Sequence, residues 1–173
     1  MSAVTVYSCK QSKDHLALLR RAAALYCKKN TESWTRMEDA CGKPFFSEAP
    51  ELCFSVSHSG DFWSCAFGPS PLGLDLQIHE NCPFSRISRR FFHADEDRIL
   101  AAQNYDPTAF FRVWTAKESY LKRIGTGITD GLGAFSVFSP LPDGSHLQYL
   151  PFAEGYTMCL CTKDEAAVSL IRF

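Results

Sequence analysis

The residues most able to do chemistry lie in two short segments, of which the first is Gly73-Leu-Asp-Leu-Gln77. Apolar and polar side chains alternate there, which predicts a strand with Asp75 and Gln77 on the same face. A carboxylate and an amide oxygen on one face are ligands that suit a hard divalent cation such as Mg²⁺. The same pattern is common where an ordinary strand follows a turn. Whether it indicates a metal site therefore depends on the second segment.

The second segment, Trp114-Thr-Ala-Lys-Glu-Ser-Tyr-Leu-Lys122, predicts a helix. Glu118 and Lys122 are four residues apart and therefore lie on one face of it. Taken alone, such a pair is most often a solvated surface pair that contributes about 0.2–0.5 kcal/mol. If the helix packs against the strand, its carboxylate and ammonium join Asp75 and Gln77 at one point. That arrangement predicts an active site for phosphoryl-type chemistry.

The elements that must position these residues follow from hydrophobic periodicity and turn signals. The pattern predicts strands at residues 4–7, 53–57, 62–67 and 73–77, and again at 134–138, 146–150, 155–162 and 167–173. Helices are predicted at 15–29, 83–92 and 107–124, with Asp14 capping the first and Asp95 capping a further short helix. Residues 30–50 predict a loop. Helices followed by strands, twice over, predict an α+β fold.

Composition and length describe a folded protein without strong charge bias. The chain has 173 residues, of which 46% are hydrophobic and 21% charged, and its net charge is -1. This balance gives no global argument for nucleic-acid binding. No apolar run approaches the roughly 18 residues of a membrane span, and the first residues lack the pattern of a signal peptide. We therefore expect a cytoplasmic protein that binds neither nucleic acid nor membrane.

The eight cysteines carry no recognisable metal or redox motif. They include no C-x-x-C pair, and no Cys/His pair with zinc spacing completes Cys159-Leu-Cys161. In a reducing cytosol, small buried thiols are expected rather than disulfides.

Three further segments carry cations, hydroxyls or an imidazole. Gly42-Lys43-Pro44 places an ammonium in a rigid loop, although an ordinary exposed lysine gives the same pattern. Phe54-Ser-Val-Ser-His-Ser-Gly60 ends a strand with Ser57 and His58, which could cradle a phosphate or be merely structural. Arginines at 86, 89 and 90 beside Phe91-Phe92 form a basic-aromatic patch, or an amphipathic helix with solvated cations.

Together and in this order, the segments resemble the 4′-phosphopantetheinyl transferase superfamily, in its single-chain, two-lobed, surfactin-synthetase-activating (Sfp-like) type. The resemblance rests on G-K-P at 42–44, F-S-V-S-H-S-G at 54–60, G-L-D-L-Q at 73–77, R-R-F-F-H-A-D-E at 89–96 and W-T-A-K-E-S-Y-L-K at 114–122. The last matches the family pattern W-x-x-K-E-[SA]-x-x-K at every fixed position. The resemblance implies one domain, 1–173, of two similar α/β lobes related by pseudo-twofold symmetry, about 1–70 and 71–173, with a shortened N-terminal lobe.

The resemblance also implies a reaction and a role for each site residue. Such enzymes transfer 4′-phosphopantetheine from coenzyme A to a serine hydroxyl of an apo acyl or peptidyl carrier protein and release 3′,5′-ADP. Asp75, Gln77 and Glu118 are then expected to bind Mg²⁺, with Glu118 also the general base. Lys122 is expected to neutralise the pyrophosphate and protonate the leaving group. The other expected contacts to coenzyme A are Lys43, Pro44, Ser57, His58 and Lys117.

Two positions depart from the family pattern. Relatives often carry Glu where this chain has Gln77, so the metal site loses one negative charge. Relatives also carry an arginine in a D-x-x-R-x-L helix motif, where the segment Asp14–Leu19 has an apolar residue. Lys13, Arg20 or Arg21 are the candidates to replace that arginine at the 3′-phosphate.

The basic-aromatic patch is the expected docking site for the carrier, because acyl carrier proteins are usually acidic. Two internal lobes favour a monomer. The sequence leaves two other functions open, namely a coenzyme A-binding module with impaired catalysis and an accessory protein that only binds a carrier. It does not identify the carrier or its pathway, nor whether acyl-coenzyme A is accepted.

Overall fold

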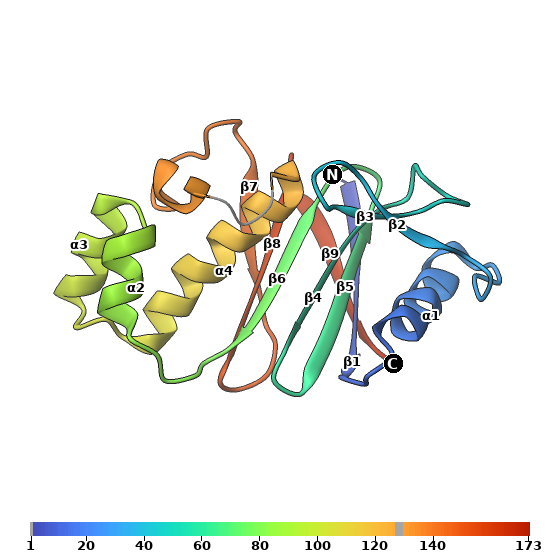
Figure 1. Ribbon diagram of the computed structural model, residues 1–173, viewed down its shortest axis with the longest axis horizontal. Coiled ribbons are helices and arrows are strands. Elements are labelled where there is room, and N and C mark those ends of the chain that lie inside the picture. The colour runs from blue at the N-terminus through green and yellow to red at the C-terminus, as the bar shows by residue number, and fades with distance from the viewer. Residues whose placement is uncertain (1, 127–129) are drawn as a thin grey trace.

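The computed structural model describes residues 2–126 and 130–173. Two sheets pack against each other, and helices cover their outer sides (Figure 1). Val4 and Val6 of the first sheet meet Leu74, Leu76 and Leu160 of the second in a shared apolar core. This arrangement of helices on segregated, largely antiparallel sheets confirms the α+β prediction.

The first sheet has the strand order β4-β5-β1-β9. Its strands are β1 (Ser2–Lys10), β4 (Cys53–Ser59), β5 (Phe62–Gly68) and β9 (Ala166–Arg172). The predicted hairpin is confirmed, since β4 and β5 pair antiparallel around a turn with Gly60 at φ 52°. Helix α1 (His15–Cys27) covers the outer face, where Leu19 packs with Phe54, Trp63 and Phe67. The carboxylate of Asp14 accepts a hydrogen bond from the backbone N–H of Ala17, so the predicted cap is confirmed.

The second sheet has the order β6-β8-β7 and is wholly antiparallel. Its strands are β6 (Gly73–Ile78), β7 (His146–Leu150) and β8 (Tyr156–Thr162). The long helix α4 (Pro107–Ile124) lies across β6 and β8 (Figure 1). Gly73 makes this contact possible, because a Cβ atom there would lie 1.9 Å from the carbonyl oxygen of Ser119. The backbones of β6 and α4 are therefore in direct contact, which brings the two chemical segments together.

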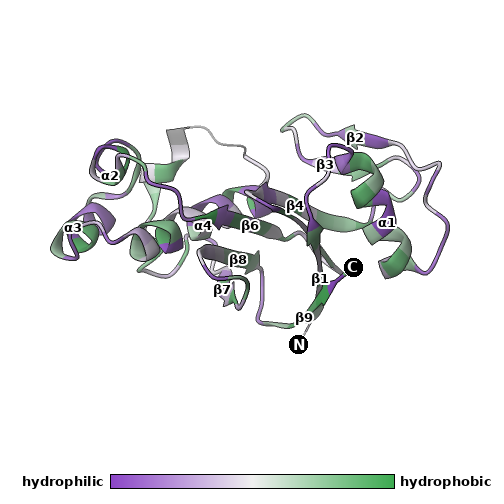
Figure 2. Cartoon of the chain, turned by 90° about the horizontal axis from the view of Figure 1, so that it is seen from below, coloured by the Kyte–Doolittle hydropathy of each residue, from purple (hydrophilic) through white to green (hydrophobic). Residues whose placement is uncertain are grey.

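Helices α2 (Phe84–Phe91) and α3 (Ala94–Ala102) pack on the other side of α4. Phe110 and Phe111 of α4 are buried in that cluster with Phe92 and Leu100. The aromatic side chains of the long helix therefore belong to the core. Figure 2 shows the strands of both sheets as largely hydrophobic, whereas hydrophilic segments lie on β2 and on the outer turns of α2 and α3.

Three predictions about elements are wrong. Residues 134–138 form no strand, because a 3₁₀ helix, η1 (Asp130–Ala134), runs directly into a turn. Residues 30–50 contain a short hairpin of β2 (Arg36–Glu38) and β3 (Pro44–Phe46). Helix α3 is capped by His93 and not by Asp95. The imidazole of His93 accepts a hydrogen bond from the backbone N–H of Asp95, and the carboxylate of Glu96 accepts one from the backbone N–H of His93.

The last strand crosses between the halves of the fold. β9 follows β8 in the chain but pairs in parallel with β1, so residues 166–172 belong to the first sheet. The predicted N-terminal and C-terminal lobes are thus tied together by the chain itself. Among the described residues, none of the helices combines the length and apolar character needed to span a bilayer.

Candidate active site

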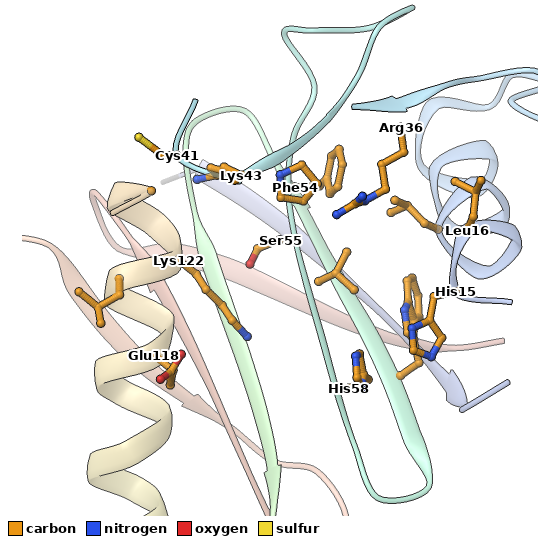
Figure 3. A pocket seen from close by; sticks show the side chains of 17 residues that line it. His15, Leu16, Arg36, Cys41, Lys43, Phe54, Ser55, His58, Glu118 and Lys122 are labelled. Atoms are coloured by element: carbon orange, nitrogen blue, oxygen red, sulfur yellow. The ribbon is translucent and has the colours of Figure 1, made fainter. Parts of the chain in front are cut away.

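A cavity of about 660 Å³ opens between α1, the β2–β3 hairpin, β4 and α4, and its volume is in the range of small-molecule sites. Glu118 and Lys122 of α4 lie on one side of it, and His15 and His58 lie on the other (Figure 3). Most of the ionisable side chains that line the cavity are basic, namely Arg36, Lys43, Lys122, His15 and His58. Glu118 is the acidic one in this lining. Such a lining favours an anionic ligand.

Asp75 is buried on β6, on the strand face that turns toward α4. Its Oδ1 atom accepts hydrogen bonds from Lys122 Nζ at 2.6 Å and from Ser57 Oγ at 3.0 Å, whereas Oδ2 has no partner. Burial raises the pKa of Asp75, and the Lys122 ammonium opposes that rise. The Lys122 side chain is 29% exposed, so its ammonium contacts Asp75 and also faces the cavity.

Glu118 lies one helical turn before Lys122 and is 3% exposed. Its Oε1 atom is buried and has no hydrogen-bond partner. Burial, and then the charge of Asp75, raise the pKa of Glu118 to about 7, although Lys122 acts to lower it. A carboxyl group with that pKa exchanges its proton near neutral pH, as a general base must.

The two unpartnered oxygens test whether the site suits a divalent cation. Asp75 Oδ2 and Glu118 Oε1 are buried carboxylate oxygens that a cation would satisfy. Within residues 2–126 and 130–173, no group of three or more His, Cys, Asp or Glu side chains could enclose a metal. Mg²⁺ needs no such cage, because it takes one or two carboxylates and completes its shell with water and substrate phosphates. The donor set therefore fits Mg²⁺.

Gln77 lies two residues beyond Asp75 on the same strand face and is half-buried. The alternation along β6 thus places it as the sequence predicts. Among the described residues, its side chain makes no hydrogen bond, and its amide does not line the cavity. Its part in metal binding remains a prediction.

Ser57 is placed differently from the expected contact with coenzyme A, because β4 turns its serines toward β6. Backbone N–H groups of β6 donate to serine hydroxyls at 2.9–3.0 Å, in the pairs Leu74–Ser55, Leu76–Ser57 and Ile78–Ser59. We call these three serines the serine ladder. The hydroxyl of Ser57 also donates to Asp75, so this side chain joins the two sheets and orients the Asp75 carboxylate.

Lys43, Pro44 and His58, which the sequence predicts to contact coenzyme A, all line the cavity. The ammonium of Lys43 donates to the carbonyl oxygen of Arg123 at 3.0 Å, and burial lowers the pKa of Lys43. The pKa of His58 is lowered by burial first, and then by the neighbouring His15 and Lys122.

Lys117 does not reach the cavity. Its side chain is fully buried on another face of α4, where Nζ forms an ion pair with Glu96 at 2.8 Å and donates to the carbonyl oxygens of Leu132 and Phe135 at 2.6 Å. Burial lowers the pKa of Lys117, and Glu96 opposes that shift. Helical geometry already separates it from Glu118, because consecutive residues lie about 100° apart around the axis. The structure does not support Lys117 as a phosphate ligand.

Two residues that bring a guanidinium or an imidazole to the cavity were not predicted from the sequence. His15 is the first residue of α1, and its ring centroid lies 4.5 Å from that of His58. Arg36 lies on β2 and points its guanidinium into the cavity (Figure 3). The alternation of Thr35-Arg-Met-Glu38 was the available signal for β2. No local signal marks His15, because its partner is 43 residues away in the chain.

The proposed substitutes for the missing arginine lie elsewhere. Arg20 donates through Nε to the carbonyl oxygen of Trp34, and Arg21 lies over the ring of Phe173. Lys13 lines a separate surface depression with Lys10 and Asp61. Among the described residues, Arg36 is the arginine that lines the cavity.

Comparison with known proteins shows which family the chain resembles. Residues 71–170 match the family described as the 4′-phosphopantetheinyl transferase superfamily. The chain is 34% identical over 134 residues to 4′-phosphopantetheinyl transferase Sfp of Bacillus subtilis, which covers 69% of this chain and 59% of that protein. It is 33% identical over 140 residues to 4′-phosphopantetheinyl transferase psf-1 of Bacillus pumilus, covering 73% of this chain and 59% of the relative. It is 36% identical over 96 residues to 4′-phosphopantetheinyl transferase gsp of Aneurinibacillus migulanus, covering 54% of this chain and 39% of that relative.

The chain thus spans less than two thirds of the length of these relatives. The matched region nevertheless contains β6 and α4 with Asp75, Glu118 and Lys122. On this sequence match, the chain belongs to the 4′-phosphopantetheinyl transferase superfamily, in its Sfp-like branch.

Proposed function

We propose that this chain is a Mg²⁺-dependent 4′-phosphopantetheinyl transferase that acts on coenzyme A and an apo acyl or peptidyl carrier protein. The observation that carries the proposal is the cluster of Asp75, Glu118 and Lys122, with two unpartnered carboxylate oxygens beside a basic cavity. The names of the relatives state the same transferase activity for those proteins.

Asp75 and Glu118, with Gln77 beside them, are the residues that would hold Mg²⁺. When bound, Mg²⁺ neutralises charge on the pyrophosphate of coenzyme A. The basic wall of the cavity then has the task of positioning the rest of the anionic substrate. Lys43 and Lys122 contribute ammonium groups to it, and His58 contributes an imidazole.

The transfer itself exchanges one phosphorus–oxygen bond for another. The carrier serine oxygen attacks the phosphorus that bears pantetheine, and its proton passes to Glu118. The bond from that phosphorus to the bridging oxygen breaks, and 3′,5′-ADP leaves with the electron pair. The Lys122 ammonium lies within 2.6 Å of Asp75 and faces the cavity, so it can neutralise or protonate the leaving phosphate. Without metal, burial and the charge of Asp75 raise the pKa of Glu118 to about 7. A bound cation would favour the carboxylate form, which is the form that accepts the serine proton.

The finer features of the fold and of the cellular context belong to the same proposal. We propose two similar lobes related by pseudo-twofold symmetry, divided near residue 71 with the N-terminal lobe shortened, and a monomer that works in the cytoplasm. The supporting observation is that each sheet carries a helix on its outer face and that the cavity lies between these helices.

The assay combines the protein with coenzyme A, Mg²⁺ and an apo carrier protein, followed by mass spectrometry of the carrier. We expect the carrier to gain the mass of phosphopantetheine on one serine. Glu118→Ala and Asp75→Ala should each abolish the gain, whereas Glu51→Gln, which removes an exposed carboxylate outside the cavity, should not. Coenzyme A binding without transfer would favour an impaired binding module. Binding of the carrier without coenzyme A binding and without transfer would favour an accessory protein.

Helix α2 is the proposed docking surface for the carrier. Arg86, Arg89 and Arg90 are exposed on it, and the neighbouring Phe91 is 43% exposed. A basic helix with an exposed aromatic ring complements an acidic partner with an apolar spot. The helix lies beside α4, the element that carries Glu118 (Figure 1).

Charge reversal tests this surface. Arg89→Glu with Arg90→Glu should lower kcat/KM for the carrier by about tenfold or more, because like charges at the interface are repulsive, and should leave coenzyme A affinity unchanged. Lys28→Glu with Lys29→Glu, at the far end of α1, makes the same charge change as a control. Unchanged carrier modification in the α2 variant would exclude α2 as the docking surface.

A further inference from the structure

Lys117 and Glu96 form a fully buried ion pair that lies outside the cavity and takes no part in the proposed chemistry. Among the described residues, no other ion pair has both side chains at 0% exposure. Lys117 Nζ contacts Glu96 at 2.8 Å and donates to the carbonyl oxygens of Leu132 and Phe135, each at 2.6 Å. An ammonium has three N–H donors, so all three of its hydrogen bonds are accounted for.

The Glu96 carboxylate is occupied as completely as the ammonium. Its Oε1 atom accepts a hydrogen bond from the backbone N–H of Val137 at 2.8 Å. Its Oε2 atom contacts Lys117 and accepts from the backbone N–H of His93 at 2.9 Å. The pair therefore connects three parts of the chain, namely α4, the start of α3 and residues 130–138. We call residues 130–138 the anchored segment.

The anchored segment depends on this pair because it has little regular structure of its own. It contains the short helix η1 and a turn, but no strand ladder. Three of its backbone groups, those of Leu132, Phe135 and Val137, bond to the two charged side chains. Burying an ion pair is costly, and apolar replacements of similar volume often leave a protein equally stable. What the charges add here is a set of directional bonds that fix the position of the segment.

The anchored segment packs directly against the end of α2, the proposed docking helix. A Cβ atom on Gly133 would lie 3.5 Å from the carbonyl oxygen of Phe91 and 3.7 Å from that of Phe92. In Figure 1, η1 (orange) lies beside α2 and α4. Phe91 is 43% exposed at this end of α2, and Phe138 of the anchored segment is 52% exposed. A shift of the segment would therefore change the surface that the carrier meets.

We propose that Glu96 and Lys117 are positioning residues for carrier binding, which hold the anchored segment against α2 and so fix the shape of the docking surface. This inference rests on the proposed function and on α2 as its docking helix. The pair touches neither coenzyme A nor the reacting atoms, since both side chains are fully buried away from the cavity. It acts on the carrier through the backbone of the anchored segment.

Three variants separate positioning from a merely stabilising role. Glu96→Gln and Lys117→Met each leave one buried charge without its partner and should lower the melting temperature strongly. The double variant, Glu96→Gln with Lys117→Met, contains no unpaired charge, so it should melt above both single variants. It nevertheless lacks the ammonium that the carbonyl oxygens of the anchored segment need.

We expect the double variant to regain stability without regaining carrier binding. Its KM for the apo carrier should be about fivefold to tenfold above the wild-type value, because the segment has lost its directional bonds. The kcat at saturating carrier, and the affinity for coenzyme A from calorimetry, should each change by less than about twofold. A merely structural role would instead lower kcat with the folded fraction and leave the carrier KM unchanged.

Hydrogen exchange followed by mass spectrometry tests the anchoring without any substrate. In the double variant the backbone amides of residues 130–138 should exchange about tenfold faster or more, whereas those of β4 and α1 keep wild-type protection. Asp95→Asn with Arg98→Met is the matched control, because it removes an exposed ion pair of α3 with the same changes of charge. The control should alter neither the carrier KM nor the exchange of the anchored segment.

A milder variant keeps the test valid if the double variant does not fold. Glu96→Asp retains the charge but shortens its reach to Val137, so it should also raise the carrier KM and the exchange of residues 130–138. Circular dichroism checks that each variant is folded.

The outcomes distinguish this inference from the proposed function. If the wild-type protein modifies no carrier, the proposed function fails and the inference fails with it. If the wild-type protein is active and the folded variants keep its carrier KM, the function stands and the positioning role is wrong. Unchanged hydrogen exchange in residues 130–138, or equal losses toward coenzyme A and carrier, would also overturn the positioning role alone.

Discussion

Glu118 combines burial, an unpartnered oxygen and a neighbouring carboxylate, so its charged form is unfavourable in the folded protein. Its folded-state pKa of about 7 lies above the ordinary value of 4.5. Between these two values the folded state holds a proton that the unfolded chain has released. This contribution to stability is present at pH 4.5 and below and is lost as pH rises through 7. The buried carboxylate therefore lowers the stability of the metal-free protein above pH 7.

Glu118→Gln should accordingly stabilise the metal-free protein at pH 8 by on the order of 1–3 kcal/mol and abolish transfer. The gain should shrink toward zero near pH 5, where the wild-type carboxyl group is already protonated. Urea denaturation at both pH values measures it. Glu51→Gln is the control, and an equal effect of Glu118→Gln at pH 5 and pH 8 would show that its charge is not the cause.

Gln77 is the residue that most distinguishes this site from the family pattern. Because it shares a strand face with Asp75, Gln77→Glu should add a charged ligand and tighten Mg²⁺ binding by about three- to tenfold, since ligand charge raises affinity for hard cations. The Mg²⁺ concentration that half-saturates transfer gives the result. Gln148→Glu on β7 provides a control with the same change of charge. If Mg²⁺ dependence does not move, Gln77 lies outside the coordination shell.

At the scale of elements, the edge strands β4 and β6 are joined by side chains and not by a backbone ladder. The serine ladder supplies hydroxyl acceptors for three N–H groups of β6 that would otherwise lack partners. Period-2 alternation places all three serines on one face of β4 and its hydrophobic residues, such as Phe54, on the other. The same spacing sets Ser57 opposite Asp75.

The ladder offers a matched pair of variants. Ser57→Ala and Ser59→Ala should each cost about 1–3 kcal/mol, because each leaves a β6 N–H without its acceptor. Only Ser57→Ala should also lower kcat, with little change in coenzyme A affinity, since Ser57, unlike Ser59, donates to Asp75. Chemical denaturation and steady-state kinetics give the two quantities. Equal kinetic effects would mean that the ladder acts on the fold and not on Asp75.

At the scale of the whole molecule, the chain closes on itself through β9. This strand extends the first sheet after the chain has completed the second, and Phe173 then packs against Tyr7 and Trp63. The first sheet supplies β4 and, through α1, His15, so the wall of the cavity opposite Glu118 depends on an intact C-terminal strand. The two halves are therefore expected to unfold together.

Ending the chain at Glu165 should remove this closure. We expect a loss of several kcal/mol, because the parallel ladder with β1 and two aromatic contacts disappear together, each aromatic pair being worth about 0.5–1.5 kcal/mol. Thermal melting followed by circular dichroism and by binding of coenzyme A should show both transitions shifted down in parallel. Ser169→Ala, an exposed change on β9, is the control. Truncation that leaves the melting temperature unchanged would show that β9 is dispensable.

The sequence alone determined the elements that are long and strongly patterned, and the chemistry carried within them. The hairpin of β4 and β5, strand β6 and helix α4 were predicted because local periodicity fixes which face of each element is apolar. That periodicity also placed Asp75 with Gln77 and Glu118 with Lys122. Short or irregular pieces were predicted poorly, namely β2, β3 and residues 134–138, because their few residues depend on contacts made elsewhere.

Only the tertiary structure decided which side chains meet. Lys117 forms an ion pair with Glu96 in the core, Ser57 donates a hydrogen bond to Asp75, and the ring of His15 contacts that of His58. The local sequence around each residue does not predict its partner. These partners are 18 to 43 residues apart in the chain, so their contact depends on how sheets and helices pack. The packing also buries Glu118 beside Asp75, and desolvation is what moves its pKa toward neutrality. The sequence therefore supplied the candidate catalytic groups, and the fold gave them their neighbours and the burial that shifts their pKa values.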